Sequence, residues 1–450
     1  MTEPDTIVAI STAPGAGAIG IVRVSGPATQ LIHSVITGNS PRPRQAQYSI
    51  FKNRQQRVVD RGIALFFPGP ESYTGEDLLE LHAHGNRLVL EQLVDCVLQC
   101  GARRARPGEF TERAFLNNKI DLIQAEAVAD LINANNLTAV KSAARSLQGE
   151  FSKLVYGLCD RIISIRTRLE AELDFSEEEI RKTTDTQLIT QLKALLEEIE
   201  KLLERSRQGQ RLQQGIDVVI MGKPNVGKST LLNRLAAKEA AIVTDTAGTT
   251  RDLIEVDILL NDMPVRITDT AGLRHADGEI EQEGIRRARL RSENADLILF
   301  VREPQQDLDQ EERAFIDNIK PDQQLIQVYN KIDRYHMQPE INDRAGKDVS
   351  AFISAKTGAG LDLLIESIKQ VFRLGEMGED LVLARKRHIT ALESCRDAIS
   401  RAIDGYLQHK ATELVAEDMK FAHQTLDEIT GVFSADDLLG KIFSEFCIGK

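Results

Sequence analysis

The chain has no long apolar run, few cysteines and no excess of positive charge. No stretch approaches the roughly 20 consecutive apolar residues of a membrane-spanning helix, and the N-terminus MTEPDTIVAIST lacks the basic start and apolar core of a signal peptide. We therefore expect a cytoplasmic protein without a membrane segment. The net charge of −12 argues against a general binder of phosphate backbones, so any RNA contact should be local.

The cysteines are odd in number and scattered, at Cys96, Cys100, Cys159, Cys395 and Cys447. Their spacing along the chain shows no metal-ligand cluster, and we expect reduced thiols rather than a disulfide framework. The chain has 450 residues, of which 42% are hydrophobic. That length and composition allow about three domains, each with a core of its own.

What the sequence does contain is a set of nucleotide-binding motifs in order. The first, GKPNVGKS at 222–229, lies between a strand-like run, IDVVIMG, and a helix-like run, STLLNRLAA. Its glycines allow successive backbone N–H groups to point at phosphate. Lys228 supplies a cation to the outer oxygens, and Ser229 offers a hydroxyl to Mg²⁺. These features predict a phosphate-binding loop.

The second motif, DTAG at 269–272, follows another strand-like run, PVRITD. Asp269 is expected within reach of the metal shell, and Gly272 allows a backbone N–H to approach the terminal phosphate. Both phosphate-sensing ends of a nucleotide switch are therefore predicted.

The third and fourth motifs, NKID at 330–333 and SAK at 354–356, indicate guanine. The carboxylate of Asp333 can accept hydrogen bonds from the ring N–H and the exocyclic amine of guanine, whereas adenine offers no such pair. A site built on such bonds rejects the wrong base by roughly 10⁴-fold. Lys331 is expected to lie along the base. The predicted nucleotide is GTP.

Two features concern hydrolysis. Leu273 stands where many GTPases carry a glutamine that orients water, and leucine can neither donate nor accept a hydrogen bond. Glu281 is the nearest carboxylate that could order the water, although it also fits a solvated acid at a helix start. Asn225 and the threonine-rich segment at 244–252 place oxygens where a monovalent cation could replace an arginine finger.

Periodicity predicts a multidomain α/β protein with an N-terminal α+β domain, an all-α helical domain and an inserted, doubly wound P-loop GTPase domain. The expected boundaries are 1–118 for the first domain, 119–212 and 376–450 for the two parts of the helical domain, and 213–375 for the GTPase domain. Neither helical part alone offers a complete core, so we expect the two to pack together. Apolar residues at three- and four-residue spacing support the long helices: Leu192, Leu195, Leu196, Ile199, Leu202 and Leu203.

Four stretches outside the nucleotide motifs resemble the MnmE (TrmE) family of tRNA modification GTPases. They are DTIVAIST followed by IGIVRVSG, ESYTGEDLLELHAHGN, RPGEFTERAFLNNKIDLIQAEAVADLI and the terminal CIGK. The resemblance spans the whole chain. It implies a homodimer that works with an FAD-dependent, MnmG-like subunit and acts on tRNA.

The reaction that this resemblance implies adds an aminomethyl or carboxymethylaminomethyl group to carbon 5 of the wobble uridine in certain tRNAs. GTP hydrolysis with Mg²⁺ and K⁺ accompanies it, and the one-carbon donor is a tetrahydrofolate derivative (5,10-methylene or 5-formyl). Matching motif positions place folate contacts at Arg23, Glu80, Lys119 and Lys450. A pterin shows the same edge as guanine, so Glu80 could read it, while basic side chains suit the glutamate tail.

The resemblance also assigns roles in the GTPase site. Lys228, Asn225 and Glu281 would act in catalysis, the last by positioning water. Mg²⁺ would be held by Ser229 and Thr250, and K⁺ by Asn225, Thr244, Thr246 and Thr249. The positions expected to contact GTP are Asn225, Val226, Gly227, Lys228, Ser229, Thr230, Thr244, Asp245, Thr246, Ala247, Gly248, Thr249, Thr250, Asp269, Thr270, Ala271, Gly272, Asn330, Lys331, Asp333, Ser354, Ala355 and Lys356.

The C-terminal tail allows two interpretations. Cys447 superficially fits a prenylation box, but Gly449 is not aliphatic and no polybasic stretch precedes it, which disfavours a lipid-anchored signalling GTPase. The family resemblance instead places Cys447 beside the folate pocket, where its thiol either takes part in catalysis or fills space. A ribosome-assembly regulatory GTPase is the remaining alternative; it predicts an appended RNA-binding module, which we do not find in the sequence.

The chain departs from the family pattern at Asn86 and Asn118, where members often carry glycine, and at Ala16, where they often carry arginine. Asparagine tolerates a positive φ better than most residues, so neither turn need break. Ala16 removes one positive charge near the expected folate pocket.

Overall fold

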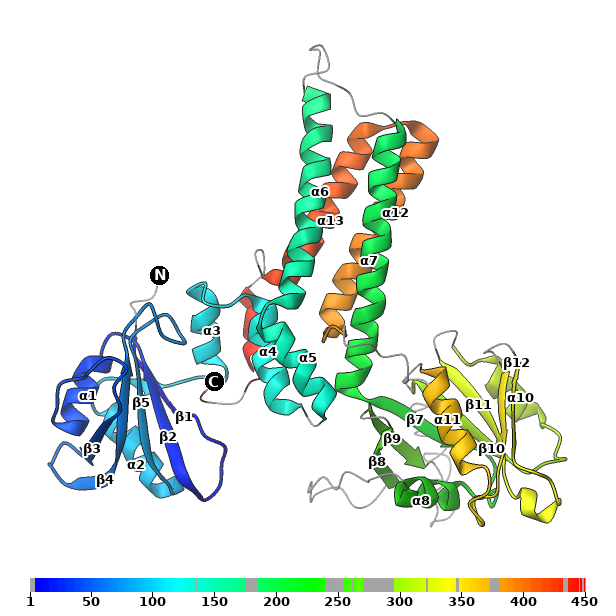
Figure 1. The fold of residues 1–450 in the computed structure, drawn as a ribbon, viewed down its shortest axis with the longest axis horizontal. Helices are drawn as coiled ribbons and strands as arrows, with labels where there is room; N and C mark the ends of the chain where they lie inside the picture. The colour runs from blue at the N-terminus through cyan, green and yellow to red at the C-terminus, as the bar shows by residue number, and fades with distance from the viewer. Residues whose placement is uncertain are drawn as a thin grey trace. The chain divides into compact units, whose positions relative to one another are not determined.

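The computed structural model describes residues 5–134, 136–174, 185–238, 254–260, 263–269, 295–320, 323–344, 348–372, 381–431, 436–444, 446 and 449 (Figure 1). The chain divides into two compact units. The first combines Met1–Asn133, Ala144–Ile199 and Thr390–Lys450, and the second combines Ala134–Ala143 and Glu200–Ile389. The domain boundaries expected from the sequence stay predictions.

The first unit begins with a six-stranded sheet in the order β3-β4-β5-β2-β1-β6. All neighbouring strands are antiparallel except β1 and β6. The helices α1 (Thr29–Thr37) and α2 (Arg87–Leu98) share a core with one face of this sheet. The strands are β1 Ile7–Ile10, β2 Gly17–Ser25, β3 Gln47–Lys52, β4 Val58–Phe67, β5 Leu78–Gly85 and β6 Arg103–Arg104.

Strand alternation separates an apolar face from a polar one. Val22 and Val24 of β2 point into the core shared with the helices, together with residues of β5. Arg23 lies between them and therefore faces the opposite side. On that side, Phe110 of α3 (Glu109–Leu116) packs against β1. The pairing of β2 with β5 shifts register between Gly17 and Gly20 and is regular from there to Ser25.

The rest of the first unit is helical. The core of α14 with α4 joins segments from before and after the nucleotide domain, and α6 packs along α13, as the incomplete cores predicted (Figure 1). Tyr406 Oη donates to Asp185 Oδ1 at 2.8 Å between two further helices. The helices of this part of the chain are α4 Leu122–Asn133, α5 Leu137–Leu147, α6 Glu150–Asp174, α7 Asp185–Gln214, α12 Lys386–His409, α13 Thr412–Thr430 and α14 Asp436–Ser444. Of these, α5, α7 and α12 also contribute residues to the second unit.

The second unit is built on a seven-stranded sheet in the order β12-β13-β11-β10-β7-β9-β8. Its five central strands, from β13 to β9, are parallel, and both edge strands are antiparallel to their neighbours. Near-continuous apolar runs in β7 and β10 are buried, as parallel strands covered on both faces require. This is the doubly wound fold that the alternating pattern predicted.

The strand and the helix on either side of the phosphate loop lie where the sequence predicts them. The strand expected at 216–222 is β7, and the helix expected after it is α8. The elements are β7 Ile216–Met221, α8 Lys228–Lys238, β8 Ile254–Leu260, β9 Met263–Asp269, β10 Leu297–Arg302, α10 Gln310–Asp317, β11 Gln324–Tyr329, the 3₁₀ turn η2 Ile332–Arg334, β12 Glu340–Arg344, β13 Asp348–Phe352 and α11 Leu361–Val371.

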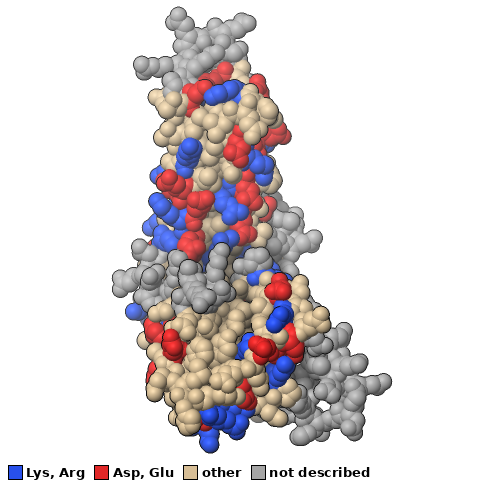
Figure 2. Space-filling view, turned by 90° about the vertical axis from the view of Figure 1, so that its right-hand side faces the viewer, with Lys and Arg blue, Asp and Glu red and all other residues tan. Residues whose placement is uncertain are grey.

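Charge of both signs is interspersed over the described helical surface. Figure 2 shows Lys and Arg alternating with Asp and Glu on the face in view, rather than a continuous basic surface. This pattern agrees with the acidic net charge and the expectation that any RNA contact is local. Among the described residues, no helix is long and apolar enough to cross a bilayer.

Candidate functional site

The phosphate loop of the second unit begins where β7 ends. Gly222 has a φ of +138°, and a Cβ placed there would lie 2.0 Å from the carbonyl oxygen of Val301 on β10. Gly227 has a φ of +99°, and its added Cβ would lie 2.3 Å from Asn330 Nδ2. Only glycine fits such positions. The loop is therefore a backbone cradle of the kind that binds phosphate, as the motif predicted.

Lys228 and Ser229 open α8, so the start of this helix faces the loop. Lys228 is buried, and its Nζ donates to the carbonyl oxygens of Gly222 and Lys223, each at 2.7 Å. The cation is thus held over the loop that precedes it. A helix N-terminus together with a buried ammonium group gives a positive potential that favours an anion.

Asn330 connects the phosphate loop to both base-reading loops. Its side chain is 2% exposed, and its Nδ2 donates to the carbonyl oxygen of Val226 at 2.7 Å. Its Oδ1 accepts from the backbone N–H groups of Lys331 at 2.8 Å and Ala355 at 2.9 Å. The three sequence motifs are therefore one hydrogen-bonded assembly.

Asp333 and Ser354 form the second link between the base-reading loops. Ser354 Oγ donates to Asp333 Oδ1 at 2.6 Å and also accepts from the backbone N–H of Thr357 at 3.2 Å. The hydrogen bond from Ser354 lowers the pKa of the Asp333 carboxyl, with Lys356 and Arg334 adding to the effect. The carboxylate is thereby kept ionised and oriented, which is the state needed to accept two hydrogen bonds from guanine.

Lys331 is held by a residue that the motifs did not reveal. Its backbone is left-handed, with φ of +69°, and its Nζ donates to Glu303 Oε1 at 2.5 Å and to the carbonyl oxygen of Asn225 at 2.6 Å. Tyr335 Oη donates to the other oxygen of Glu303 at 3.0 Å. The hydrogen bond from Lys331 lowers the pKa of Glu303. Glu303 follows directly after β10. Its position at the end of a predicted strand is the feature of the sequence that could have indicated a role in the site.

These loops enclose a cavity of about 560 Å³. That volume lies within the range of small-molecule sites, and the lining is polar and cationic with one carboxylate. The residues that line it are Pro224, Asn225, Gly227, Lys228, Ser229, Thr230, Asn330, Lys331, Asp333, Arg334, Ala355 and Lys356. Of the predicted GTP contacts in the described part of the chain, Val226 and Ser354 support this cavity through hydrogen bonds.

Several predicted residues lie outside the described part of the chain. Of Asp269, the structure gives the backbone at the end of β9. The others are Thr244, Asp245, Thr246, Ala247, Gly248, Thr249, Thr250, Thr270, Ala271, Gly272, Leu273, Glu281, Cys447 and Lys450. The expected K⁺ set, the water-positioning carboxylate and the terminal folate contact therefore stay predictions.

A second polar site lies on the N-terminal sheet. Arg23 of β2 and Glu80 of β5 are directly paired in register, and Arg23 Nε and Nη2 donate to Glu80 Oε1 at 3.0 and 2.9 Å. The guanidinium carbon lies 5.6 Å from the Tyr73 ring centroid and 5.8 Å from that of Phe110, within cation–π range. Glu80 Oε2 contacts His82 Nε2 at 3.1 Å. The predicted pair is thus assembled on the face away from the helical core.

Lys119 lies in the loop after α3. It is exposed, and its Cγ would lie 3.4 Å from a Cβ added at Gly75, in the loop that also carries Tyr73. In the described part of the chain no hydrogen bond or ion pair joins Lys119 to Arg23 or Glu80. The structure therefore brings two of the predicted folate residues into contact, and places the third beside a neighbouring loop.

The two asparagines that replace family glycines behave differently. Asn118 has a φ of +55°, so the tolerance of asparagine for this conformation is used there, as expected. Asn86 has a φ of −101° and instead caps α2, where its side chain accepts from the Leu88 N–H at 2.9 Å. Asparagine is a favoured N-cap residue. Of the two positions, only Asn118 uses the positive φ.

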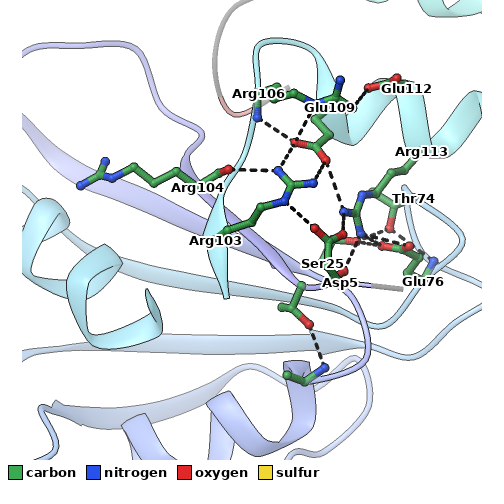
Figure 3. A network of polar contacts seen from close by, with 12 residues as sticks. Asp5, Ser25, Thr74, Glu76, Arg103, Arg104, Arg106, Glu109, Glu112 and Arg113 are labelled. Atoms are coloured by element: carbon green, nitrogen blue, oxygen red, sulfur yellow. Dashed lines mark hydrogen bonds and ion pairs between the residues drawn. The ribbon is translucent and has the colours of Figure 1, made fainter. Parts of the chain in front are cut away.

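An ion network lies around the start of α3, beside β6 (Figure 3). The Glu109 side chain is 3% exposed and accepts from Arg103 Nη1 and Nη2 at 2.8 and 2.5 Å and from the Arg106 N–H at 2.7 Å. Arg113 Nη2 donates to Asp5 Oδ1 at 2.5 Å, and its Nη1 donates to Glu76 Oε2 at 2.9 Å. The network fastens α3, which carries Phe110, to the sheet.

A doubly wound sheet, a glycine cradle before α8 and an oriented carboxylate for guanine define a P-loop GTPase. Comparison with known proteins specifies the family. Residues 6–119 match the model described as the GTP-binding protein TrmE N-terminus, and residues 122–447 match the model of the MnmE helical domain. The chain belongs to the MnmE family of tRNA modification GTPases.

Individual relatives agree over the full length. The chain is 46% identical over 446 residues to the tRNA modification GTPase MnmE of Hydrogenovibrio crunogenus and 47% identical over 452 residues to that of Legionella pneumophila strain Paris, with 99% of each chain covered. Solved structures similar to it include an Era variant of Aquifex aeolicus (28% identity, TM-score 0.27, 41% of this chain and 66% of that one). The G domain of T. maritima FeoB is another (23% identity, TM-score 0.26, 35% and 98%).

Proposed function

We propose that this chain hydrolyses GTP with Mg²⁺ and K⁺ and that hydrolysis is coupled to modification of carbon 5 of the wobble uridine in certain tRNAs. This chain acts as a homodimer, and its partner in the reaction is an FAD-dependent, MnmG-like subunit. The full-length similarity to tRNA modification GTPases supports tRNA as the substrate. The observation that carries the GTP assignment is the Asp333 carboxylate held by Ser354 at the edge of the phosphate cradle.

We assign a task in GTP binding or hydrolysis to the following residues. The backbone of Gly222–Gly227 and the N-terminus of α8 bind the phosphates, and Lys228 balances their charge. In this proposal Ser229 holds Mg²⁺ and Asn225 holds K⁺; such ions neutralise charge that develops on the phosphates. Asn330 keeps the loops in register, and Asp333 reads the base. Glu281 is proposed to position water.

The test of base recognition is Asp333→Asn. An amide in place of the carboxylate loses the acceptor for the guanine amine but can donate to an oxygen, so affinity should fall for GTP and rise for xanthosine triphosphate. We expect a loss of at least about 10³-fold for GTP. Asp362→Asn, on α11, is the matched control, since Asp362 does not line the cavity. Unchanged GTP affinity in Asp333→Asn would refute the assignment.

Potassium dependence is tested by the hydrolysis rate in K⁺ against Na⁺ at equal ionic strength. We expect faster turnover in K⁺ and loss of that difference in Asn225→Ala. Equal rates in the two cations, together with wobble uridines that are still modified in a strain lacking this protein, would contradict the coupled function. Co-sedimentation with ribosomal subunits would then favour a regulatory GTPase.

We further propose that Arg23 and Glu80 bind the reduced folate, with Lys119, Lys450 and Cys447 nearby. Glu80 would accept from the pterin amine and ring N–H, while Arg23 holds Glu80 in place and offers charge to a carboxylate. Tyr73 and Phe110 supply an apolar, aromatic wall beside the pair. The site therefore combines the acceptor and the flat surface that a pterin requires.

Calorimetric titration of 5-formyltetrahydrofolate into the purified chain tests this site. Glu80→Ala should abolish the heat of binding, because the partner of the pterin edge is lost. Glu91→Ala is the control. It removes a carboxylate of α2 that pairs with Arg104 of β6 at 2.8 Å, and it should leave folate binding unchanged. Equal binding by both variants would remove Glu80 from the site.

A further inference from the structure

Three side chains of different metal-binding chemistry meet inside the helical part of the first unit. Cys159 belongs to α6, and His423 and Asp427 belong to α13. One ligand atom of each lies within 4.8 Å of those of the other two, and His423 Nε2 is 3.5 Å from Asp427 Oδ2. Residues four apart on a helix share a face, which is why His423 and Asp427 point together toward α6.

The position of this group is unusual for polar side chains. Cys159 is 5% exposed and Asp427 is 6% exposed, and His423 is half-buried. Two of the three side chains are therefore shielded from solvent where α6 packs along α13.

We propose that Cys159, His423 and Asp427 form a binding site for one divalent transition-metal ion of the zinc type, which joins α6 to α13. A thiolate, an imidazole and a carboxylate are the donor set that Zn²⁺ and Co²⁺ accept, whereas Mg²⁺ prefers oxygen ligands alone. Binding releases the thiol proton to solvent, because the ligand is the thiolate. Water completes a tetrahedral shell.

The proposed ion would have a structural effect. The helix α6 precedes the nucleotide domain in the chain and α13 follows it, so the ion would fasten together the two parts of the helical domain. Without an ion, the Asp427 carboxylate can be compensated by the charges of His423 and Arg166, and Cys159 then only fills apolar space. The two arrangements differ in whether sulfur is bonded to metal, which spectroscopy detects directly.

The experiment uses Co²⁺ added to the full chain after treatment with a chelator, with Mg²⁺ and GDP present to fill the nucleotide site. We expect one Co²⁺ per chain, a thiolate-to-cobalt charge-transfer band in the near ultraviolet and the intense visible bands of tetrahedral cobalt. Cys159→Ser should remove the charge-transfer band, and His423→Gln should weaken Co²⁺ binding by at least about a hundredfold, beyond the effect typical of losing an outer partner. Cys96→Ser, a buried cysteine of the N-terminal domain, should change neither.

A second measurement keeps the proposal testable if a variant is less stable. The unfolding midpoint of each protein is compared with and without Zn²⁺, so that each variant serves as its own reference. At about a hundredfold excess over Kd, the wild type should gain roughly 5–10 °C, and Cys159→Ser and His423→Gln should gain nothing. Absence of the charge-transfer band in wild type, or its persistence in Cys159→Ser, would overturn the site.

Discussion

Asn330 Nδ2 donates to the carbonyl oxygen of Val226 at 2.7 Å, although the two residues are 104 positions apart. The same side chain accepts from two further backbone N–H groups, so one buried amide holds three loops in register. The phosphate end and the base end of the cavity are therefore not independent.

Asn330→Ala should consequently damage both ends. Three backbone groups lose their partner in a buried place, which costs about 3 kcal/mol in the free energy of unfolding of the nucleotide unit. We expect a comparable loss in GTP affinity. Denaturant unfolding and nucleotide titration measure the two effects. Asn318→Ala is the control, because Asn318 is exposed and its side chain donates to the Ala314 carbonyl oxygen at the end of α10. An equal effect of the two changes would contradict the role of Asn330.

Ser354→Ala should change the pH dependence of GTP binding. The Ser354 hydroxyl lowers the pKa of Asp333, so in the wild type the carboxylate stays ionised, and binding persists, below the ordinary value of 3.8. A lowered pKa means that affinity is present above it and is lost as pH falls through it. Without the hydroxyl, that loss should begin at higher pH. Nucleotide affinity measured across acidic pH tests this, with Ser367→Ala on α11 as control.

Glu109→Gln should destabilise the N-terminal domain. Burial alone would raise the pKa of Glu109, but hydrogen bonds from Arg103 and the Arg106 N–H outweigh it, and the net shift is downward. Neutralising this carboxylate, whose side chain is 3% exposed, removes one of the anions that compensate the guanidinium groups of Arg103 and Arg113. We expect a loss of about 3 kcal/mol at neutral pH.

The wild-type advantage from Glu109 should fade as pH falls through and below 4.5, the ordinary value, because the folded state has the lower pKa. Unfolding of both proteins at neutral and acidic pH measures this difference. Glu91→Gln breaks an exposed pair with Arg104 and should cost no more than about 1 kcal/mol. A Glu109→Gln protein as stable as Glu91→Gln would show that the network contributes little.

Gly227→Ala should abolish GTP binding. Its φ of +99° strains any other residue, and the added Cβ would lie 2.3 Å from Asn330 Nδ2. Gly358 has a similar φ of +91° but open space around it. Gly358→Ala therefore isolates the strain, about 1–2 kcal/mol, from the clash. Thermal unfolding and GTP titration of both variants separate the two causes; equal GTP affinities would refute the steric argument.

The fold and the nucleotide site could be predicted largely from local patterns. The glycines and Lys228 are close in sequence and their spacing carries the chemistry, so β7, the loop and α8 appear where expected. Asn118 could be predicted because a positive φ is a local property. Asn86 could not, since a cap and a turn glycine look alike without the backbone direction.

Groupings that depend on packing were not predictable. Glu303 contacts Lys331 because β10 ends beside that loop, and its own neighbours in sequence do not show this. Cys159 is separated from His423 by most of the chain, so no spacing rule indicates that they meet; the expectation of scattered cysteines without a ligand group reflects that limit. Only the pairing of α6 with α13 brings them together.

The alternation along β2 has a consequence for how this family can vary. From Gly20 to Ser25 the strand is paired residue by residue with β5, so deleting or adding one position there would send Arg23 into the apolar interior and turn Val22 or Val24 outward. Insertions and deletions in related proteins should therefore occur near Gly17, where the register of the pairing already shifts, and should be rare between Gly20 and Ser25.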